Sequence, residues 1–262
     1  MKKYIVLILA CCFFHALFAQ ELTKIPETAF KAGEKLSYKL KYGIFTAAEA
    51  DIHVEDSPIK FNNQQAYHII AEGRTAGTFD VFYKVRNRYE SYVDRNTLLP
   101  YFYAENRHES SYKHTDKVTF DQEKKTVTAA KGTFPYTTDQ LFDFVSAYYF
   151  ARCIDISKIH VGEKLNVDYF LEDGIHTLTI TYVGKEKISC SMGTFNCLKF
   201  NPTIIPGRIF RKDSKLYLWI TDDNNRIPVK AHVEVVVGSL TMDLTAASGL
   251  KYPLNPVSKT TD

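Results

Sequence analysis

Apolar and polar residues alternate along most of the chain, and this alternation predicts β-strands. In Leu36–Tyr42 the leucines and tyrosines face one way while lysines and a serine face the other. In 48–55, alanine, isoleucine and valine alternate with acidic residues and a histidine, so these acidic residues could pair across the sheet with the lysines. The predicted strands are 33–43, 48–55, 65–73, 83–93, 101–112, 117–128, 165–172, 175–183, 198–204, 215–220, 226–237 and 240–246.

Residues 173 and 174, Asp-Gly, carry the strongest turn signal in the chain. Two strand patterns, 165–172 and 175–183, flank this dipeptide. Asp-Gly suits a type I′ turn because both central residues of that turn need positive φ. The pattern therefore predicts a β-hairpin here.

One segment, 137–152, predicts a helix. Leu141, Val145, Tyr148 and Tyr149 recur at helical spacing, and neighbouring aromatic residues widen the apolar stripe. Thr137 and Gln140 match a capping box at its start. So much apolar area on one helix indicates that it packs against the sheet.

These elements predict a mainly β protein, an antiparallel open barrel or strongly curved sheet with a central helix on its concave side. A single domain would cover 20–250, and 251–262 would form a flexible tail. Gly33-Glu34-Lys35-Leu36 recurs as Gly162-Glu163-Lys164-Leu165, each time opening a strand. This repeat raises the alternative of two similar halves, 33–135 and 162–249, around the helix.

The first 19 residues have the three parts of a secretory signal: Lys2 and Lys3, an apolar run, and the small Ala19 before Gln20. A membrane anchor would need about 20 apolar residues, and a lipoprotein site at Cys11 fits less well. We expect cleavage after Ala19 and a periplasmic or otherwise extracytoplasmic mature chain without a transmembrane segment. Cleavage would lower the formal net charge of +3 by two. A nearly neutral protein is not expected to bind nucleic acid.

Three cysteines, Cys153, Cys190 and Cys197, would remain after cleavage. Export to an oxidising compartment favours a disulfide, and a short span separates Cys190 from Cys197. We predict that these two form it, with three free thiols as the alternative. The histidines do not stand in ligand spacing to the cysteines, so no metal site is expected.

Two rows of side chains in the middle strands are candidate ligand-binding residues. Lys84, Arg86 and Arg88 share one face of their strand. Tyr101, Tyr103, Glu105 and Arg107 share a face of the next. Facing a barrel interior, these rows would bind an amphiphile or glycan; facing outward, they would be a charged surface, and we favour the outward orientation. The candidates are Arg86, Arg88, Tyr101, Tyr103 and Arg107.

The chain carries no recognisable catalytic signature. It lacks a nucleophile elbow, a phosphate-binding loop and a dinucleotide fingerprint, so no catalytic residue or cofactor is predicted. The local group of His108, Glu105 and Glu109 keeps a hydrolase as an alternative. A small basic cluster, 207–212, is typical of a solvated loop, although it could meet an anionic envelope surface.

Two motifs, one near each end of the mature chain, resemble a known family. They are Gly33-Glu34-x-Leu36-x-Tyr38 with Tyr42-Gly43 behind it, and Leu218-Trp219-Ile220-x-Asp222 followed by Arg226-x-Pro228-Val229-Lys230. The pattern resembles an uncharacterised family of exported bacterial proteins that is known as a domain of unknown function. The resemblance implies export and a β-rich fold, and it brings no activity or catalytic residues.

The preferred function is that of a non-enzymatic periplasmic protein that binds a lipid-like or saccharide component of the cell envelope. Export, the aromatic-rich β architecture and the missing catalytic signature motivate this hypothesis. The alternatives are a structural or assembly protein that meets a protein partner through a sheet face or edge, and an envelope hydrolase.

Overall fold

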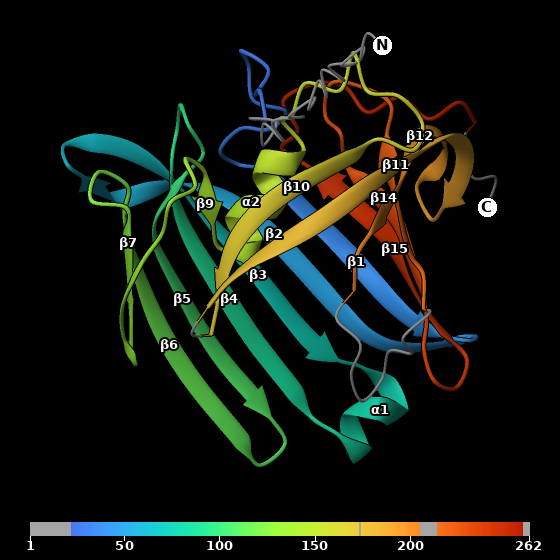
Figure 1. Ribbon diagram of the computed structural model, residues 1–262. Coiled ribbons are helices and arrows are strands. Elements are labelled where there is room, and N and C mark those ends of the chain that lie inside the picture. Colours follow the sequence, from blue (N-terminus) through green and yellow to red (C-terminus); the bar gives the residue numbers. More distant parts are fainter. Residues whose placement is uncertain (1–21, 173, 205–213, 259–262) are drawn as a thin grey trace, which may run out of the picture.

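A curved, unclosed sheet surrounds a short helix (Figure 1). The computed structural model describes residues 22–172, 174–204 and 214–258. Within them, 15 strands follow the order β8-β7-β6-β5-β4-β3-β2-β1-β15-β14-β13-β12-β11-β10-β9. All neighbouring strands are antiparallel except β9 and β10. The predicted fold class, a strongly curved β-sheet with a helix on its concave side, is confirmed.

The first half of the chain forms an antiparallel meander. Each strand is paired with the next along the chain, as the alternating pattern predicted. A turn at Asp121–Lys125 divides the predicted strand 117–128 into two, because the Asp121 carboxylate accepts the Lys124 N–H. The strands are β1 Lys35–Tyr42, β2 Phe45–Phe61, β3 Gln64–Thr75, β4 Val85–Asp94, β5 Pro100–Glu109, β6 Tyr112–Asp121, β7 Thr126–Ala129 and β8 Gly132–Pro135.

The second half forms another meander, which ends beside the first strand. The predicted hairpin is present, with Leu171 paired to Gly174, so Gly174 belongs to the strand rather than to the turn. Residue 173 lies outside the described residues. The strands are β9 Leu141–Phe142, β10 Lys164–Leu171, β11 Gly174–Cys190, β12 Gly193–Pro202, β13 Leu216–Thr221, β14 Pro228–Glu234 and β15 Ser239–Ser248.

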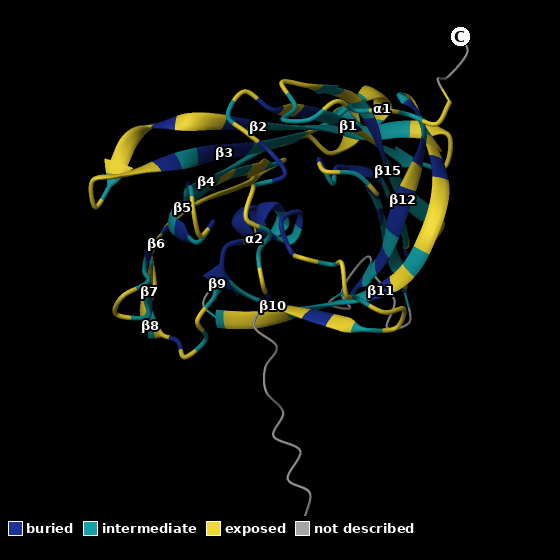
Figure 2. Cartoon of the chain, turned by 90° about the horizontal axis from the view of Figure 1, so that it is seen from above, coloured by how far each residue is buried: buried dark blue, intermediate teal, exposed yellow. Residues whose placement is uncertain are grey.

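The two meanders join where β1 pairs with β15. At the opposite side the sheet stays open, because β9 pairs with only Asp168 and Tyr169 of β10 and β8 ends the other edge. Seen from above, the helix α2 (Phe144–Ala151) lies inside the curve and is largely buried (Figure 2). The curvature and the open seam together define one concave face.

The helix starts later than predicted. Asp143 caps it, since its carboxylate accepts the N–H groups of Val145 and Ser146 while the Ser146 hydroxyl accepts the Asp143 N–H. The predicted capping box at Thr137 and Gln140 is therefore wrong. The two residues before the cap extend along β10 as β9, a tertiary pairing that overrides local helix propensity.

The helix contributes its aromatic side chains to the main core. Tyr149 and Phe150 are buried, and Tyr148 is partly buried against the same cluster. A second helix, α1 (Gly77–Phe82), was not predicted; it lies at the far end of the sheet, between β3 and β4. None of the described helices is both long and apolar enough to cross a membrane.

A buried ion pair ties the end of α2 to the start of β1. Arg152 donates from Nη1 and Nη2 to the Glu34 carboxylate at 2.6 and 2.9 Å, and both side chains are fully buried. Arg152 also donates to the Asn225 carbonyl oxygen at 2.9 Å, and the Tyr149 hydroxyl donates to Glu34. Glu34 of the first sequence motif and Asn225, which directly precedes Arg226 of the second, therefore meet at the end of this helix.

The predicted Cys190–Cys197 disulfide is not present, because the strand register holds the two residues apart. Cys190 pairs with Gly193 at the hairpin turn, whereas Cys197 pairs with Glu186. An offset of four residues along a strand corresponds to roughly 13 Å, and a disulfide requires Cα atoms less than about 7 Å apart.

The segment predicted as a flexible tail is attached as far as Ser258. Val257 donates its N–H to the Thr194 carbonyl oxygen at 2.7 Å, and Thr194 donates to Ser258 at 2.9 Å. Leu254 packs against a second apolar cluster. The predicted basic cluster 207–212 and the first 19 residues lie outside the described residues.

Candidate functional site: a polar pocket on the concave face

Contacts with α2 identify the concave face of the middle strands. The Ser91 hydroxyl donates to Asp143 at 2.6 Å, and the rings of Tyr89 and Tyr103 meet the Phe144 ring edge-on at 4.9 and 5.7 Å. Side chains alternate along a strand. Glu105 and Arg107 therefore share the concave face with Tyr103.

Arg86 and Arg88 have the opposite parity and lie on the outer face, the orientation that the sequence favoured. Arg86 donates to Asp80 at 2.7 Å, and Arg88 donates to Glu72 at 2.6 Å and to Glu90 at 2.9 Å. The Arg86 hydrogen bond holds the pKa of Asp80 well below its usual value. Each guanidinium is already neutralised, so these two residues do not form an anion site.

Tyr101 does not share the pocket with Tyr103. The register between β4 and β5 shifts beside it, and its hydroxyl donates to Asp94 at 2.7 Å. Its ring stacks on Phe61 at 5.0 Å. Burial, reinforced by the Asp94 carboxylate, raises its pKa. The bulge thus separates Tyr101 from the row that its sequence position suggested.

Tyr103 and Arg107 face inward, so the outward orientation favoured for their row is wrong. They line a pocket of about 260 Å³ between the concave face and the tips of two hairpins. Strands β5 and β6 supply its floor, and the β7–β8 and β10–β11 hairpins supply its rim. The β10–β11 hairpin is distant from this floor in the sequence, so alternation alone could not reveal its contribution. The lining residues are Tyr103, Glu105, Arg107, Tyr112, His114, Asp116, Val118, Ala130, Lys131, Phe170, Leu171 and Glu172.

Glu105 is a shared acceptor in this pocket. The Tyr103 hydroxyl donates to its Oε2 at 2.8 Å, and Nε2 of His114 lies 3.2 Å from its Oε1. Burial, followed by the nearby Glu105 carboxylate, raises the pKa of Tyr103 far above its usual value. Tyr103 therefore remains a neutral hydrogen-bond donor rather than a nucleophile.

Arg107 is held on the opposite side of the same floor. Its Nε donates to Glu109 at 3.1 Å, and Asn87 donates to the same Glu109 oxygen at 2.9 Å. The Arg107 hydrogen bond lowers the pKa of Glu109. The guanidinium lies over the Tyr112 ring at 5.4 Å, and Tyr112 is half exposed. This arrangement presents an aromatic ring and a cation together.

The charges of the pocket do not favour an anion. Glu105, Asp116 and Glu172 bring three carboxylates, against the cations of Arg107 and Lys131. Arg107 is already paired with Glu109. Hydroxyl or amine groups fit this lining better than phosphate or carboxylate, because they donate hydrogen bonds to the carboxylates.

The group proposed for a hydrolase is divided between the two faces of β5. Glu105 and Glu109 face inward, whereas the adjacent His108 is exposed and lies on the outer face, beside Arg86 and Arg88. His108 cannot act with Glu105. His114, which was not among the candidate site residues, is the histidine that reaches this carboxylate.

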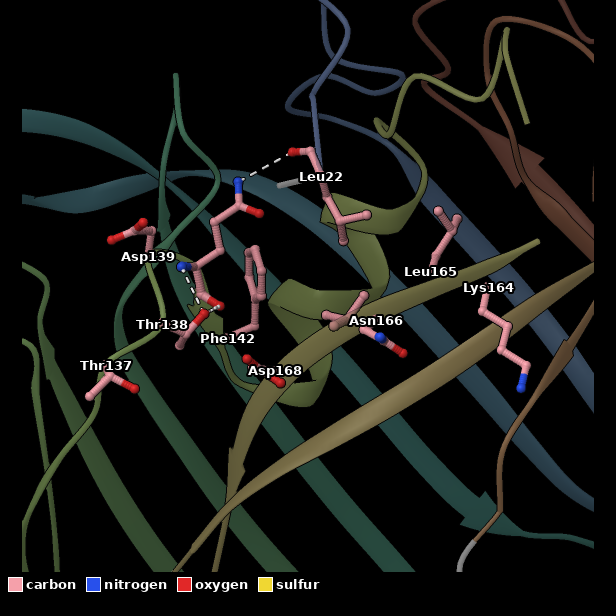
Figure 3. Close-up of a pocket in the computed structure, with 11 residues that line it drawn as sticks. Leu22, Thr137, Thr138, Asp139, Phe142, Lys164, Leu165, Asn166 and Asp168 are labelled. Atoms are coloured by element: carbon pink, nitrogen blue, oxygen red, sulfur yellow. Dashed lines mark hydrogen bonds between the residues drawn. The ribbon is translucent and has the colours of Figure 1, made fainter. Parts of the chain in front are cut away.

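A second pocket, of about 430 Å³, follows the open seam along β10 (Figure 3). Residues 137–140 line one side of it, and Gln140 donates to the Leu22 carbonyl oxygen at 3.3 Å. Of its charged residues, Asp139 and Lys164 lie at opposite ends in Figure 3, and Asp168 lies between them. Asp139 is paired with Lys125, and Asp168 accepts the Thr177 hydroxyl at 2.6 Å. Both carboxylates of the seam pocket therefore already have partners in the chain.

The comparisons support the fold and assign no activity. The profile of a family described as "Protein of unknown function (DUF3108)" matches residues 37–245. A beta-barrel-like protein of the domain of unknown function DUF1849 from Brucella abortus is similar over 82% of this chain and 96% of its own, with 10% identity and a TM-score of 0.52. This similarity concerns the fold alone.

Two further solved structures have lower similarity. A protein from Parabacteroides distasonis, provisionally described as a lipoprotein, has 11% identity and a TM-score of 0.35 over 86% of this chain and all of its own. A protein from Bacteroides fragilis, provisionally described as exported and YmcC-like in fold, has 9% identity and a TM-score of 0.34 over 87% and 99%. No curated protein matches the sequence.

Proposed function

The chain belongs to the DUF3108 family, and we propose that this member is an exported, non-enzymatic envelope protein that binds an amphiphile through a hydroxyl- or amine-bearing head group. The head group would occupy the pocket of Tyr103, Glu105, Arg107 and His114. The observation that carries the proposal is the convergence of these donors and acceptors with the Tyr112 ring on a concave face.

The neighbouring strands supply an apolar wall for the rest of the ligand. Tyr38 meets Tyr148 of α2, so Leu40 and its cross-strand partners Ala48 and Met242 also face inward, beyond the helix. These side chains are only partly buried. A polar wall on β4–β6 and an apolar wall on β1, β2 and β15 suit a molecule with two chemically different ends.

The apolar cavity behind α2 is a poorer site for an alkyl chain. Ile154, Leu165 and Phe200 are among the residues that line it, and its volume is about 50 Å³. Small-molecule pockets usually measure about 300–1,000 Å³. The open concave face is therefore the better place for the apolar part.

Calorimetric titration with dodecyl maltoside below its critical micelle concentration tests the proposal. We expect binding by the natural protein and at least a tenfold loss of affinity in Tyr112→Ala and His114→Ala. Ala48→Phe should weaken dodecyl maltoside and leave any maltose binding unchanged. Arg86→Ala, on the outer face, is the matched control and should bind normally.

Other results would redirect or overturn the assignment. Equal affinity for maltose and dodecyl maltoside would support a glycan ligand in the same pocket without an alkyl chain. Tighter binding of dodecyl phosphate than of dodecyl maltoside would contradict the charge argument. Absence of binding, or binding untouched by Tyr112→Ala and His114→Ala, would remove the pocket as the site.

A further inference from the structure

Large apolar side chains are exposed together at the end of the sheet where α1 lies. The side chains of Ile44, Val81, Phe82 and Val237 are 89%, 82%, 81% and 71% exposed. Phe45 and Val236 are exposed beside them. They occupy the β1–β2 turn, the end of α1 and the β14–β15 turn, whereas solvated turns are usually rich in polar residues and glycine. We call this set the apolar rim.

Contacts among the three segments make the apolar rim one surface. The Tyr42 hydroxyl donates to the Val237 carbonyl oxygen at 2.9 Å. The Tyr42 ring packs edge-on to Phe79 of α1, with ring centroids 6.3 Å apart. Figure 1 shows α1 and both turns at the same end of the sheet, away from α2. Contiguous exposed apolar surface of this kind marks an interaction site.

We propose that the apolar rim docks the protein on a lipid bilayer, with the tips of the three segments inserted at the level of the head groups. The apolar side chains lie on separate projecting tips. A fluid lipid bilayer can deform around these tips, so all of them can insert at once. Tyr42 and the half-exposed Tyr83 lie at the base of the tips, a position that suits amphipathic rings at a membrane interface.

The charges around the apolar rim fit an anionic lipid surface. Lys84 follows Tyr83 in the chain and is exposed. Its carbonyl oxygen accepts the Ser110 N–H, which places the β5–β6 turn and the exposed Lys113 of β6 alongside. Asp80 of α1 is neutralised by Arg86. Glu234 is the exposed acid at the base of the β14–β15 turn. Basic residues beside an apolar surface strengthen binding to anionic lipids.

Co-sedimentation with phosphatidylcholine vesicles, with and without phosphatidylglycerol, tests the docking. The natural protein should sediment with both and more with the anionic vesicles. The double variant Val81→Ser/Phe82→Ser should lower the bound fraction at least tenfold. Lys84→Glu should abolish the increase in bound fraction caused by phosphatidylglycerol and leave binding to phosphatidylcholine vesicles unchanged. The matched control is Val161→Ser, at a 70% exposed valine before β10.

The outcomes separate this docking from ligand binding in the pocket. His114→Ala should sediment as the natural protein does, even where it no longer binds dodecyl maltoside. Failure of the natural protein to sediment, or sedimentation that Val81→Ser/Phe82→Ser leaves intact, would overturn the proposal. A dimer in light scattering that this double variant dissociates, without vesicle binding, would assign the apolar rim to a second copy of the chain instead.

Discussion

The same four residues, Gly-Glu-Lys-Leu, open β1 and β10, and the structure gives their backbones the same course. Gly33 and Gly162 have φ of 95° and 90°. Their N–H groups donate to Val54 and Tyr182 at 2.7 and 2.8 Å, and these residues donate back to Glu34 and Glu163 at 2.9 Å in both places. Strands β2 and β11, which receive these bonds, are each 17 residues long. Internal duplication stays a prediction that this match supports.

We call the two Gly-Glu-Lys-Leu segments the β1 corner and the β10 corner. Their glutamate side chains differ in burial and in partner. Glu34 is fully buried against Arg152, whereas Glu163 is partly exposed and accepts the His160 N–H at 2.9 Å. The difference comes from the partner: α2 ends over β1 and places Arg152 there, and the described residues supply no such cation at β10. Local sequence therefore determines the turn, and the tertiary partner determines whether its charge is buried.

The largest effect should come from removing the buried charge. Glu34→Gln leaves the Arg152 guanidinium buried without its counterion, and such a loss costs about 3–5 kcal/mol. Glu163→Gln should change stability by less than about 0.5 kcal/mol, because its carboxylate is solvated. Urea unfolding of both variants measures the difference. Equal destabilisation of the two would refute the distinction between the corners.

A double-mutant cycle makes this test specific to the pair. Arg152→Gln and Glu34→Gln should each lower the free energy of unfolding strongly. The double variant should lose less than the sum of the two single losses, with a coupling energy of about 2–3 kcal/mol. Additive losses would mean that Arg152 acts mainly through the Asn225 carbonyl oxygen.

Alternation along the chain predicted most of the sheet, because strands such as β1 and β10 bury one face more than the other, but it missed β8 and β9. It could not predict where the helix starts, because Thr137/Gln140 and Asp143/Ser146 are both acceptable caps. Pairing of Leu141 and Phe142 with β10 selects the second one. This pairing joins residues that are distant in the sequence, which a local pattern does not contain.

The alternation of side chains also predicted which candidate residues share a face of their strand. It could not predict whether that face is the concave or the outer face of the sheet. Tyr103 and Arg107 line the pocket because Phe144 packs on their face of β5. A bulge removes Tyr101 from that row. His114 was missed because it is recognisable only as the cross-strand partner of Arg107. The hairpin turn near Ser110 fixes the register between β5 and β6. Recognising this turn in the sequence would have placed His114 opposite Arg107.

A smaller effect, equal in both corners, should follow from substituting the glycines. No heavy atom outside the adjacent residues lies within 4 Å of a Cβ built on Gly33 or Gly162, so the cost arises from the positive φ alone. Such a conformation costs a residue with a Cβ roughly 1–2 kcal/mol. Gly33→Ala and Gly162→Ala should therefore destabilise alike in urea unfolding. A difference above about 1 kcal/mol would show that the corners are not equivalent even in backbone.

The cysteines provide the last contrast, with little effect on stability. Cys153 lies beneath the segment that leads to Gly33 and accepts the Ala29 N–H, and Cys197 is buried in the second half. Burial raises the pKa of all three thiols, that of Cys197 to about 12, so none should form the reactive thiolate readily near pH 8. Access of the reagent therefore decides the order, and Cys190 is the partly exposed residue among the three. Ellman's reagent should modify Cys190 first, and the other two only after unfolding. Cys190→Ser is the control: it should abolish the fast phase in native protein, and a fast phase that persists would place a reactive thiol in one of the two sites described as buried.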